Sequence, residues 1–271
     1  MCPKLTSVAV ADCEEVLAAW DQICRSLELS RHIFLFTDFD GTLSPIVPVP
    51  GTALIDPGAK ESLRQLNAEK TITTALLSGR SVSDLMSRVG LPIIYAGDHG
   101  LEIQGPGFEF LAPGAEALAL ELPPLCDRIQ HAIRHIPGAI VELKRFTASV
   151  HFRQVAPEHV PAVMDAVHTF GASSRFEIRN GDCVLELRPR LNWNKGDAVR
   201  WILDKYGATG EQAICIGDDL TDEDMFRKVP EGVNVKVLRG DPSDTAARYC
   251  LRQPEVAGFL HGIVDLIQGM T

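Results

Sequence analysis

The sequence predicts an α/β fold, with a doubly wound, mostly parallel sheet and a smaller α+β domain inserted into it. Four short apolar runs, each continuous enough to be buried on both faces, are separated by stretches of helical periodicity. Between residues 108 and 190 the pattern changes to shorter runs in which polar and apolar residues alternate. Strands alternating with helices are typical of a parallel sheet covered on both sides, and the altered stretch is typical of a separate unit.

A helix is expected first, because residues 7–28 carry apolar side chains at helical spacing. The four apolar runs predict buried strands at 33–36, 73–77, 93–96 and 213–216. Helical periodicity predicts helices at 57–70, 81–89, 195–206 and 255–267.

The inserted stretch has its own pattern of elements. Helices are expected at 113–135 and 157–170, and strands at 139–143, 147–153, 175–179 and 182–188. Asn180 and Gly181 are a strong signal for a two-residue hairpin turn between the last two strands. We therefore expect an N-terminal helical segment, a core in two pieces and an inserted domain, with bounds 1–30, 31–107 with 191–271, and 108–190.

Composition and charge exclude several classes of function. The 271 residues include 26 Lys and Arg against 36 Asp and Glu, a formal net charge of −10 that repels nucleic acid and anionic lipid. No apolar run reaches the roughly 18 residues of a membrane span, and the N-terminus shows no secretory signal pattern. The seven cysteines include no C-x-x-C pair. We expect a cytoplasmic protein with reduced thiols that acts on a small molecule and binds neither nucleic acid nor membrane.

All four apolar runs end at their carboxyl side in Asp, Ser or His next to Gly. In open parallel sheets, ligands bind at that edge. After the first run come Asp38 and Asp40, followed by Gly41. Two carboxylates in one crevice repel each other, so the pair needs a cation, or one acid must hold a proton. An Asx-type turn explains one Asp and the glycine well, and two Asp poorly.

Such a pair suits phosphoryl transfer. One carboxylate can attack phosphorus while a protonated neighbour donates to the leaving oxygen. Gly41 permits a tight turn that exposes backbone N–H groups to phosphate oxygens.

A second acidic cluster follows the fourth run, at residues 217–224. The cap and first turn of a helix account for residues 222–224. Asp218 and Asp219 remain at the end of the strand, where carboxylates and phosphate together suit Mg²⁺.

These motifs, in this order, resemble the haloacid-dehalogenase superfamily of phosphohydrolases over about residues 33–240. The resemblance implies the Rossmann-like core of that superfamily. It implies Asp38 as the nucleophile and Asp40 as the general acid and then the general base. Ser78 and Lys195 would bind the phosphoryl oxygens, with Gly41 and Thr42 also facing the substrate.

The same resemblance implies a magnesium ion as cofactor. Its ligands would be the Asp38 carboxylate, the Asp40 backbone carbonyl and the Asp218 carboxylate, with Asp219 and Asp222 close by.

A finer resemblance, to the trehalose-6-phosphate phosphatases, rests on residues 38–46, 97–102, 142–153 and 186–196. It implies an α/β cap in the inserted stretch and trehalose 6-phosphate as the substrate. The side chains that it implies for binding the disaccharide hydroxyls are Glu102, Lys144, Glu186 and Arg188. Charged hydrogen bonds to sugar hydroxyls discriminate strongly, because a wrong sugar leaves buried charges unpaired.

Two alternatives stay open. The same machinery could act on another sugar phosphate, such as sucrose phosphate or a glycosyl-3-phosphoglycerate, and Glu102, Lys144 and Glu186 discriminate between these substrates. A non-catalytic sugar-phosphate-binding module would not need Asp38 or Asp40, and both are present. The role of the leading helix, including whether it binds a partner synthase, is left open.

Arg80 is interpreted either as a phosphate ligand or as the start of the next helix, and it stays outside the predicted catalytic set. His99, beside the expected crevice, is given an orienting or packing role.

Overall fold

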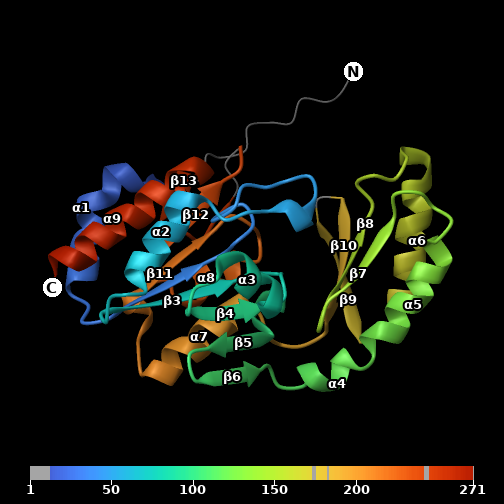
Figure 1. Cartoon of the computed structure of the whole chain (residues 1–271), viewed down its shortest axis with the longest axis horizontal. Coiled ribbons are helices and arrows are strands. Elements are labelled where there is room, and N and C mark those ends of the chain that lie inside the picture. The colour runs from blue at the N-terminus through green and yellow to red at the C-terminus, as the bar shows by residue number, and fades with distance from the viewer. Residues whose placement is uncertain (1–12, 173–174, 182, 241–243, 271) are drawn as a thin grey trace. The chain divides into compact units, whose positions relative to one another are not determined.

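The computed structural model describes residues 13–172, 175–181, 183–240 and 244–270 (Figure 1). The chain divides into two compact units. One contains residues 1–109 and 194–271, and the other contains residues 110–193.

The larger sheet has nine strands in the order β1-β13-β12-β11-β2-β3-β4-β5-β6. Their bounds are β1 Glu14–Glu15, β2 Ile33–Thr37, β3 Ile72–Leu77, β4 Ile94–Gly97, β5 Glu102–Gly105, β6 Phe108–Leu111, β11 Ala213–Gly217, β12 Val233–Leu238 and β13 Tyr249–Arg252. All neighbours from β1 to β4 pair in parallel, and β4 and β5 pair antiparallel. The predicted mostly parallel sheet is confirmed.

Helices cover both faces of this sheet. Their bounds are α1 Val16–Glu28, α2 Pro57–Leu66, α3 Val82–Val89, α7 Lys195–Tyr206, α8 Glu223–Lys228 and α9 Val256–Gly269. Ile33 and Leu35 of β2 lie in a buried cluster with α1, α2, α3 and α9. Phe34, between them, contacts Tyr206 of α7 with ring centroids 5.5 Å apart. Alternate side chains of one strand point to opposite faces, so the sheet is doubly wound as predicted.

The N-terminal segment and several strands of this unit differ from the sequence prediction, and β5, β6 and β13 were not predicted. The leading helix begins only at Val16, because Glu14 and Glu15 form β1 beside β13; residues 7–12 of the predicted helix lie outside the described residues. Strand β12 was not predicted, because Asn234 and Lys236 interrupt its apolar pattern. Both are buried, and Asn234 Nδ2 donates to the Val229 carbonyl at 2.8 Å.

The unit of residues 110–193 has a four-stranded antiparallel sheet in the order β7-β8-β10-β9 (Figure 1). Its elements are α4 Ala115–Ala119, α5 Leu122–Ile133, β7 Ile140–Leu143, β8 Ala148–His151, α6 Val160–Gly171, β9 Phe176–Gly181 and β10 Val184–Pro189. The helix predicted at 113–135 is two helices, because two prolines lie in the first turn of α5.

The predicted hairpin turn at Asn180 and Gly181 is wrong. Asn180 pairs with Leu185 and Gly181 with Val184, so both lie inside β9; residue 182 lies outside the described residues. This register makes six residue pairs and sets Ile178 opposite Leu187. The longer ladder, with its apolar cross-strand pair, outweighs the local turn preference.

Among the described residues, no helix combines the length and the hydropathy that crossing a bilayer requires.

Candidate active site

The site lies at the carboxyl ends of three neighbouring parallel strands. Asp38 follows β2, Ser78 follows β3 and Asp218 follows β11. Backbone hydrogen bonds extend the sheet to two of these residues, from Asp38 N to the Ile216 carbonyl and from Ser78 N to the Ala96 carbonyl, each at 2.9 Å. The three predicted residues are therefore brought to one edge by strand pairing.

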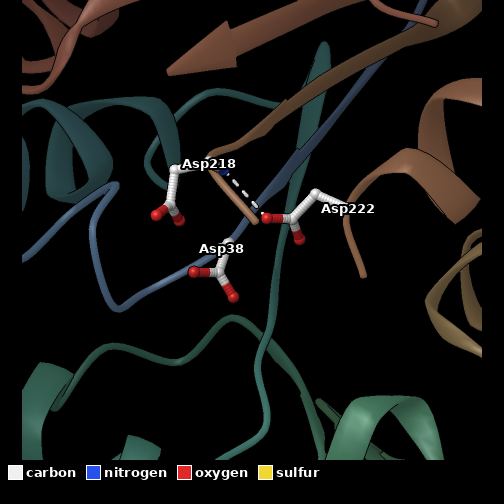
Figure 2. Close-up of side chains that lie close together, drawn as sticks. All are labelled: Asp38, Asp218 and Asp222. Carbon is white, nitrogen blue, oxygen red and sulfur yellow. Dashed lines mark hydrogen bonds between the residues drawn. The ribbon is translucent and has the colours of Figure 1, made fainter. Parts of the chain in front are cut away.

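Three buried carboxylates meet there, those of Asp38, Asp218 and Asp222 (Figure 2). One oxygen from each lies within 4.8 Å of the others. Burial, and then the neighbouring acids, hold the pKa of Asp38 well above its usual value. Burial and Asp222 raise the pKa of Asp218 to about 7. Carboxylates crowded in this way call for a cation.

Lys195 supplies one cation. Its Nζ donates to Oδ1 of Asp38 and to Oδ1 of Asp222, both at 2.6 Å, and the side chain is 2% exposed. Burial alone would lower the pKa of Lys195, but Asp222 and Asp38 raise it above its usual value. Lys195 opens α7, where a capping box between Asn194 and Asp197 fixes the first turn. The ammonium therefore enters the site from a rigid helix end.

Asp222 has more partners than a helix cap requires. Its Oδ2 accepts a hydrogen bond from the backbone N–H of Asp218 at 2.9 Å (Figure 2). The backbone N–H of Asp219 donates to the same oxygen, also at 2.9 Å. It makes no side-chain cap hydrogen bond to α8, so the expected capping role is wrong for this residue. Asp222 instead fixes the loop after β11 and pairs with Lys195.

Gly41 lies where only glycine fits. Its φ is +84°, and a Cβ there would overlap the Asp218 carboxylate. Next to it, Thr42 is buried and its hydroxyl donates to Oδ1 of Asp218 at 3.2 Å. The turn after β2 thus packs tightly against Asp218.

Asp40 is held by an arginine that the sequence analysis left out of the catalytic set. Arg80 donates from Nε to Oδ2 of Asp40 at 2.6 Å and from Nη2 to Oδ1 at 2.7 Å. Its Nη1 donates to Asp84 at 2.8 Å. Arg80 thus contacts the carboxylate expected to act as acid and base, and it is not simply the first residue of the next helix, which begins at Val82.

Two further features stand out beside these residues, a cation that the sequence did not point to and a strained turn at the expected crevice. Arg239, just after β12, forms an ion pair with Asp218 and donates from Nη2 to the Asp40 carbonyl at 3.3 Å. Asp98 and His99, after β4, have φ values of 48° and 61°. Left-handed backbone at two consecutive residues other than glycine is costly and is found most often at functional sites.

The remaining predicted residues lie in two places. Glu102 begins β5 opposite Gly97. Lys144 follows β7, and Glu186 and Arg188 lie on β10, where Arg188 Nε donates to Glu186 at 3.0 Å.

The three residues of the inserted unit share the polar face of its sheet. Glu186 pairs across the sheet with Ser149 and Arg179, and Ser149 pairs with Glu142. Lys144 and Arg188 follow at alternate positions, on the same face. The opposite face carries Val150, Leu185 and Leu187, which are buried against α5 and α6.

The donor set at the strand ends fits a hard divalent cation. It offers carboxylate oxygens from Asp38 and Asp218 and the carbonyl oxygen of Asp40, which are the ligands that Mg²⁺ prefers. Oδ2 of Asp218 is buried and, apart from its ion pair with Arg239, has no hydrogen-bond donor, which suits a metal ligand.

The chain is similar to known proteins over most of its length. The family model for trehalose-phosphatase matches residues 36–255. The trehalose-phosphate phosphatase of Mycobacterium bovis (strain BCG / Pasteur 1173P2) is 40% identical over 240 residues, 85% of this chain and 61% of that protein. The chain thus spans about three fifths of the length of this relative.

Solved structures share the fold. A trehalose-6-phosphate phosphatase related protein has a TM-score of 0.78 at 22% identity and covers 88% of this chain and 100% of its own. The C-terminal domain of a trehalose-6-phosphate phosphatase from C. albicans has a TM-score of 0.75 at 21% identity and covers 92% and 96%. Since the family model covers most of the residues, the chain belongs to the trehalose-phosphatase family.

Proposed function

We propose that the protein is a Mg²⁺-dependent phosphatase that hydrolyses trehalose 6-phosphate to trehalose and phosphate through an aspartyl-phosphate intermediate. The observation that carries the proposal is the pairing of Asp38 with Lys195 among three buried carboxylates at the strand ends. The name of the M. bovis relative supports this substrate.

In the first step, an Asp38 carboxylate oxygen attacks phosphorus and the bond from phosphorus to the sugar oxygen breaks. Asp40 gives its proton to the departing oxygen, so that trehalose leaves as a neutral alcohol. Lys195 stabilises the charge that spreads over the phosphoryl oxygens. Ser78 orients the same group. The expected part of the Gly41 N–H is not kept, because this N–H donates to the Ser44 carbonyl at 2.7 Å.

In the second step, a water molecule attacks the phosphorus of the aspartyl phosphate. Asp40 takes the proton of this water, the bond from phosphorus to Asp38 breaks, and phosphate leaves. Asp40 therefore returns to the protonated form that the first step requires.

Asp38, the Asp40 carbonyl and Asp218 would hold the magnesium ion, whose positive charge would offset the negative charge of the phosphoryl group. Asp222 holds the backbone of Asp218, and Thr42 holds its Oδ1, so these two residues keep the ligand in place.

Lys144, Glu186 and Arg188 would bind the disaccharide on the polar face of the inserted unit, with Glu102 contributing from β5. Arg188 donates a hydrogen bond to Glu186, and this contact orders both side chains in the absence of sugar. Less conformational entropy is then lost when the sugar binds. In this proposal, the unit of residues 110–193 is the cap of the enzyme.

Phosphate release tests the proposal. The substrates are trehalose 6-phosphate, sucrose 6-phosphate, glucose 6-phosphate and glucosyl-3-phosphoglycerate, each with Mg²⁺ and with EDTA. A preference for trehalose 6-phosphate that EDTA abolishes is the expected result. Metal-dependent release from another substrate would contradict the assignment of the sugar and keep the chemistry. Phosphate release that EDTA leaves unchanged would contradict the proposed dependence on Mg²⁺.

A further inference from the structure

The guanidinium of Arg239 contacts two of the oxygen atoms that the proposal above assigns to the metal. Its Nη2 forms an ion pair with the Asp218 carboxylate and donates to the backbone carbonyl of Asp40 at 3.3 Å. A Cβ at Gly41 would overlap both this Nη2 and Oδ2 of Asp218. Nη2 of Arg239 therefore lies beside Gly41 and in contact with both oxygens.

Lys195 makes its hydrogen bonds to Asp38 and to Asp222. Oδ1 of Asp218 accepts from the Thr42 hydroxyl, while Oδ2 is buried and has Arg239 as its ion-pair partner. Lys195 also offsets the charge of Asp218 from a distance, but Arg239 is the cation in contact with it.

Glu223 contacts described residues on either side of Arg239 in the sequence. On one side, Lys236 Nζ contacts Oε1 of Glu223 at 3.2 Å and donates to the Asp219 carbonyl at 3.1 Å. On the other side, the Thr245 hydroxyl and the Ala246 N–H donate to Glu223 at 2.8 and 2.7 Å. These contacts keep the guanidinium within reach of the site.

We propose that Arg239 occupies the metal position in the metal-free protein, and that Mg²⁺ binds only when this guanidinium leaves. The inference rests on the magnesium site proposed above. A site that Arg239 fills for a fraction of the time has its apparent metal affinity reduced by that fraction. The same contact stabilises the metal-free fold by offsetting the charge on a buried carboxylate.

The test compares wild-type protein with Arg239→Gln by calorimetric titration of Mg²⁺ and by thermal unfolding in EDTA. We expect Arg239→Gln to bind Mg²⁺ about tenfold more tightly, as for a site filled about 90% of the time. Its Tm in EDTA should fall by about 2–4 °C, and saturating Mg²⁺ should remove this difference. Arg64→Gln is the matched control, because it also removes one positive charge, from an exposed ion pair with Glu61.

Arg239→Lys separates displacement from simple charge repulsion. Lysine keeps the positive charge, but its side chain is shorter. Its ammonium therefore falls short of the position from which Nη2 of Arg239 contacts both oxygens. Displacement predicts that Arg239→Lys binds Mg²⁺ nearly as tightly as Arg239→Gln. Repulsion alone predicts the wild-type affinity for Arg239→Lys.

The two proposals fail differently. Wild-type protein that binds no Mg²⁺ would overturn the metal site and this inference with it. Wild-type protein that binds Mg²⁺ with an affinity that Arg239→Gln leaves unchanged or weakens would overturn this inference alone. Wild-type behaviour of Arg239→Lys would overturn it as well.

Discussion

Arg80 binds both carboxylate oxygens of Asp40, with hydrogen bonds of 2.6 and 2.7 Å. The contact therefore fixes the orientation of the side chain to which the proposal assigns proton transfer to the leaving sugar oxygen.

Arg80→Gln should lower kcat for trehalose 6-phosphate by about tenfold to a hundredfold, a part of the effect that general acid–base catalysis contributes. An aryl phosphate, whose leaving group needs little protonation, should lose much less. The measurement is the ratio of the two kcat values, together with the pH profile of each.

Arg88→Gln is the matched control, because Arg88 also binds Asp84 and a backbone carbonyl of the preceding loop, that of Ala53, but does not touch Asp40. Equal losses on both substrates would place the effect in the second step, which the two substrates share. The same loss in Arg88→Gln would show that Arg80 only holds the loop.

The free energy of unfolding should change in opposite directions when Asp38 and when Asp222 is changed to Asn. Asp38→Asn should have no measurable turnover, because an amide is a poor nucleophile. It should nevertheless gain about 1 kcal/mol in free energy of unfolding in EDTA, since it relieves crowded buried charges. Its remaining carbonyl oxygen can still accept from Lys195.

Asp222→Asn should lose about 3–5 kcal/mol of free energy of unfolding, because it breaks a buried ion pair. It also sets the amide NH2 group either against the Lys195 ammonium or against the two backbone N–H donors. Urea denaturation in EDTA measures both variants. Equal destabilisation in the two would contradict the separate roles that we assign to them.

Glu186→Gln should slow the hydrolysis of trehalose 6-phosphate and leave the hydrolysis of an aryl phosphate unchanged, because the aryl ester has no sugar hydroxyl to bind. We expect kcat/KM for the disaccharide to fall by about tenfold to a hundredfold, the effect of about 1.5–3 kcal/mol from one charged hydrogen bond. Glu177→Gln is the control, since Glu177 lies on the same sheet face and pairs with the exposed Arg179. If kcat/KM falls equally for both substrates in Glu186→Gln, Glu186 supports the fold and does not bind sugar.

The meeting of Asp38 and Asp218 could be predicted because each directly follows a buried run, and parallel neighbours end at one edge of a sheet. The contact between Arg80 and Asp40 could not be, because an arginine after Ser-Gly is equally consistent with the start of a helix. Arg239 had no signal at all: it lies 199 residues from Asp40 in the sequence and outside any motif. Side chains that reach a site from a neighbouring loop depend on tertiary packing, which local patterns do not encode.

A side chain at residue 41 would be unfavourable for two separate reasons. The first is the backbone conformation, since φ is +84° and a residue with a Cβ costs about 1–2 kcal/mol in that region. The second is steric, since the new Cβ would overlap the Asp218 carboxylate. In Gly107→Ala only the first reason applies, because φ is +80° and no heavy atom lies within 4 Å of the new Cβ.

We therefore expect Gly107→Ala to lose only the free energy of unfolding that the positive φ costs, and to keep wild-type Mg²⁺ affinity and turnover. Gly41→Ala should lose more in urea denaturation, and its Mg²⁺ affinity should fall by about tenfold or more, because Asp218 can no longer hold its position. Calorimetric titration of the two variants decides the matter. If Gly41→Ala binds Mg²⁺ as Gly107→Ala does, the close approach of the turn to Asp218 has no part in forming the metal site.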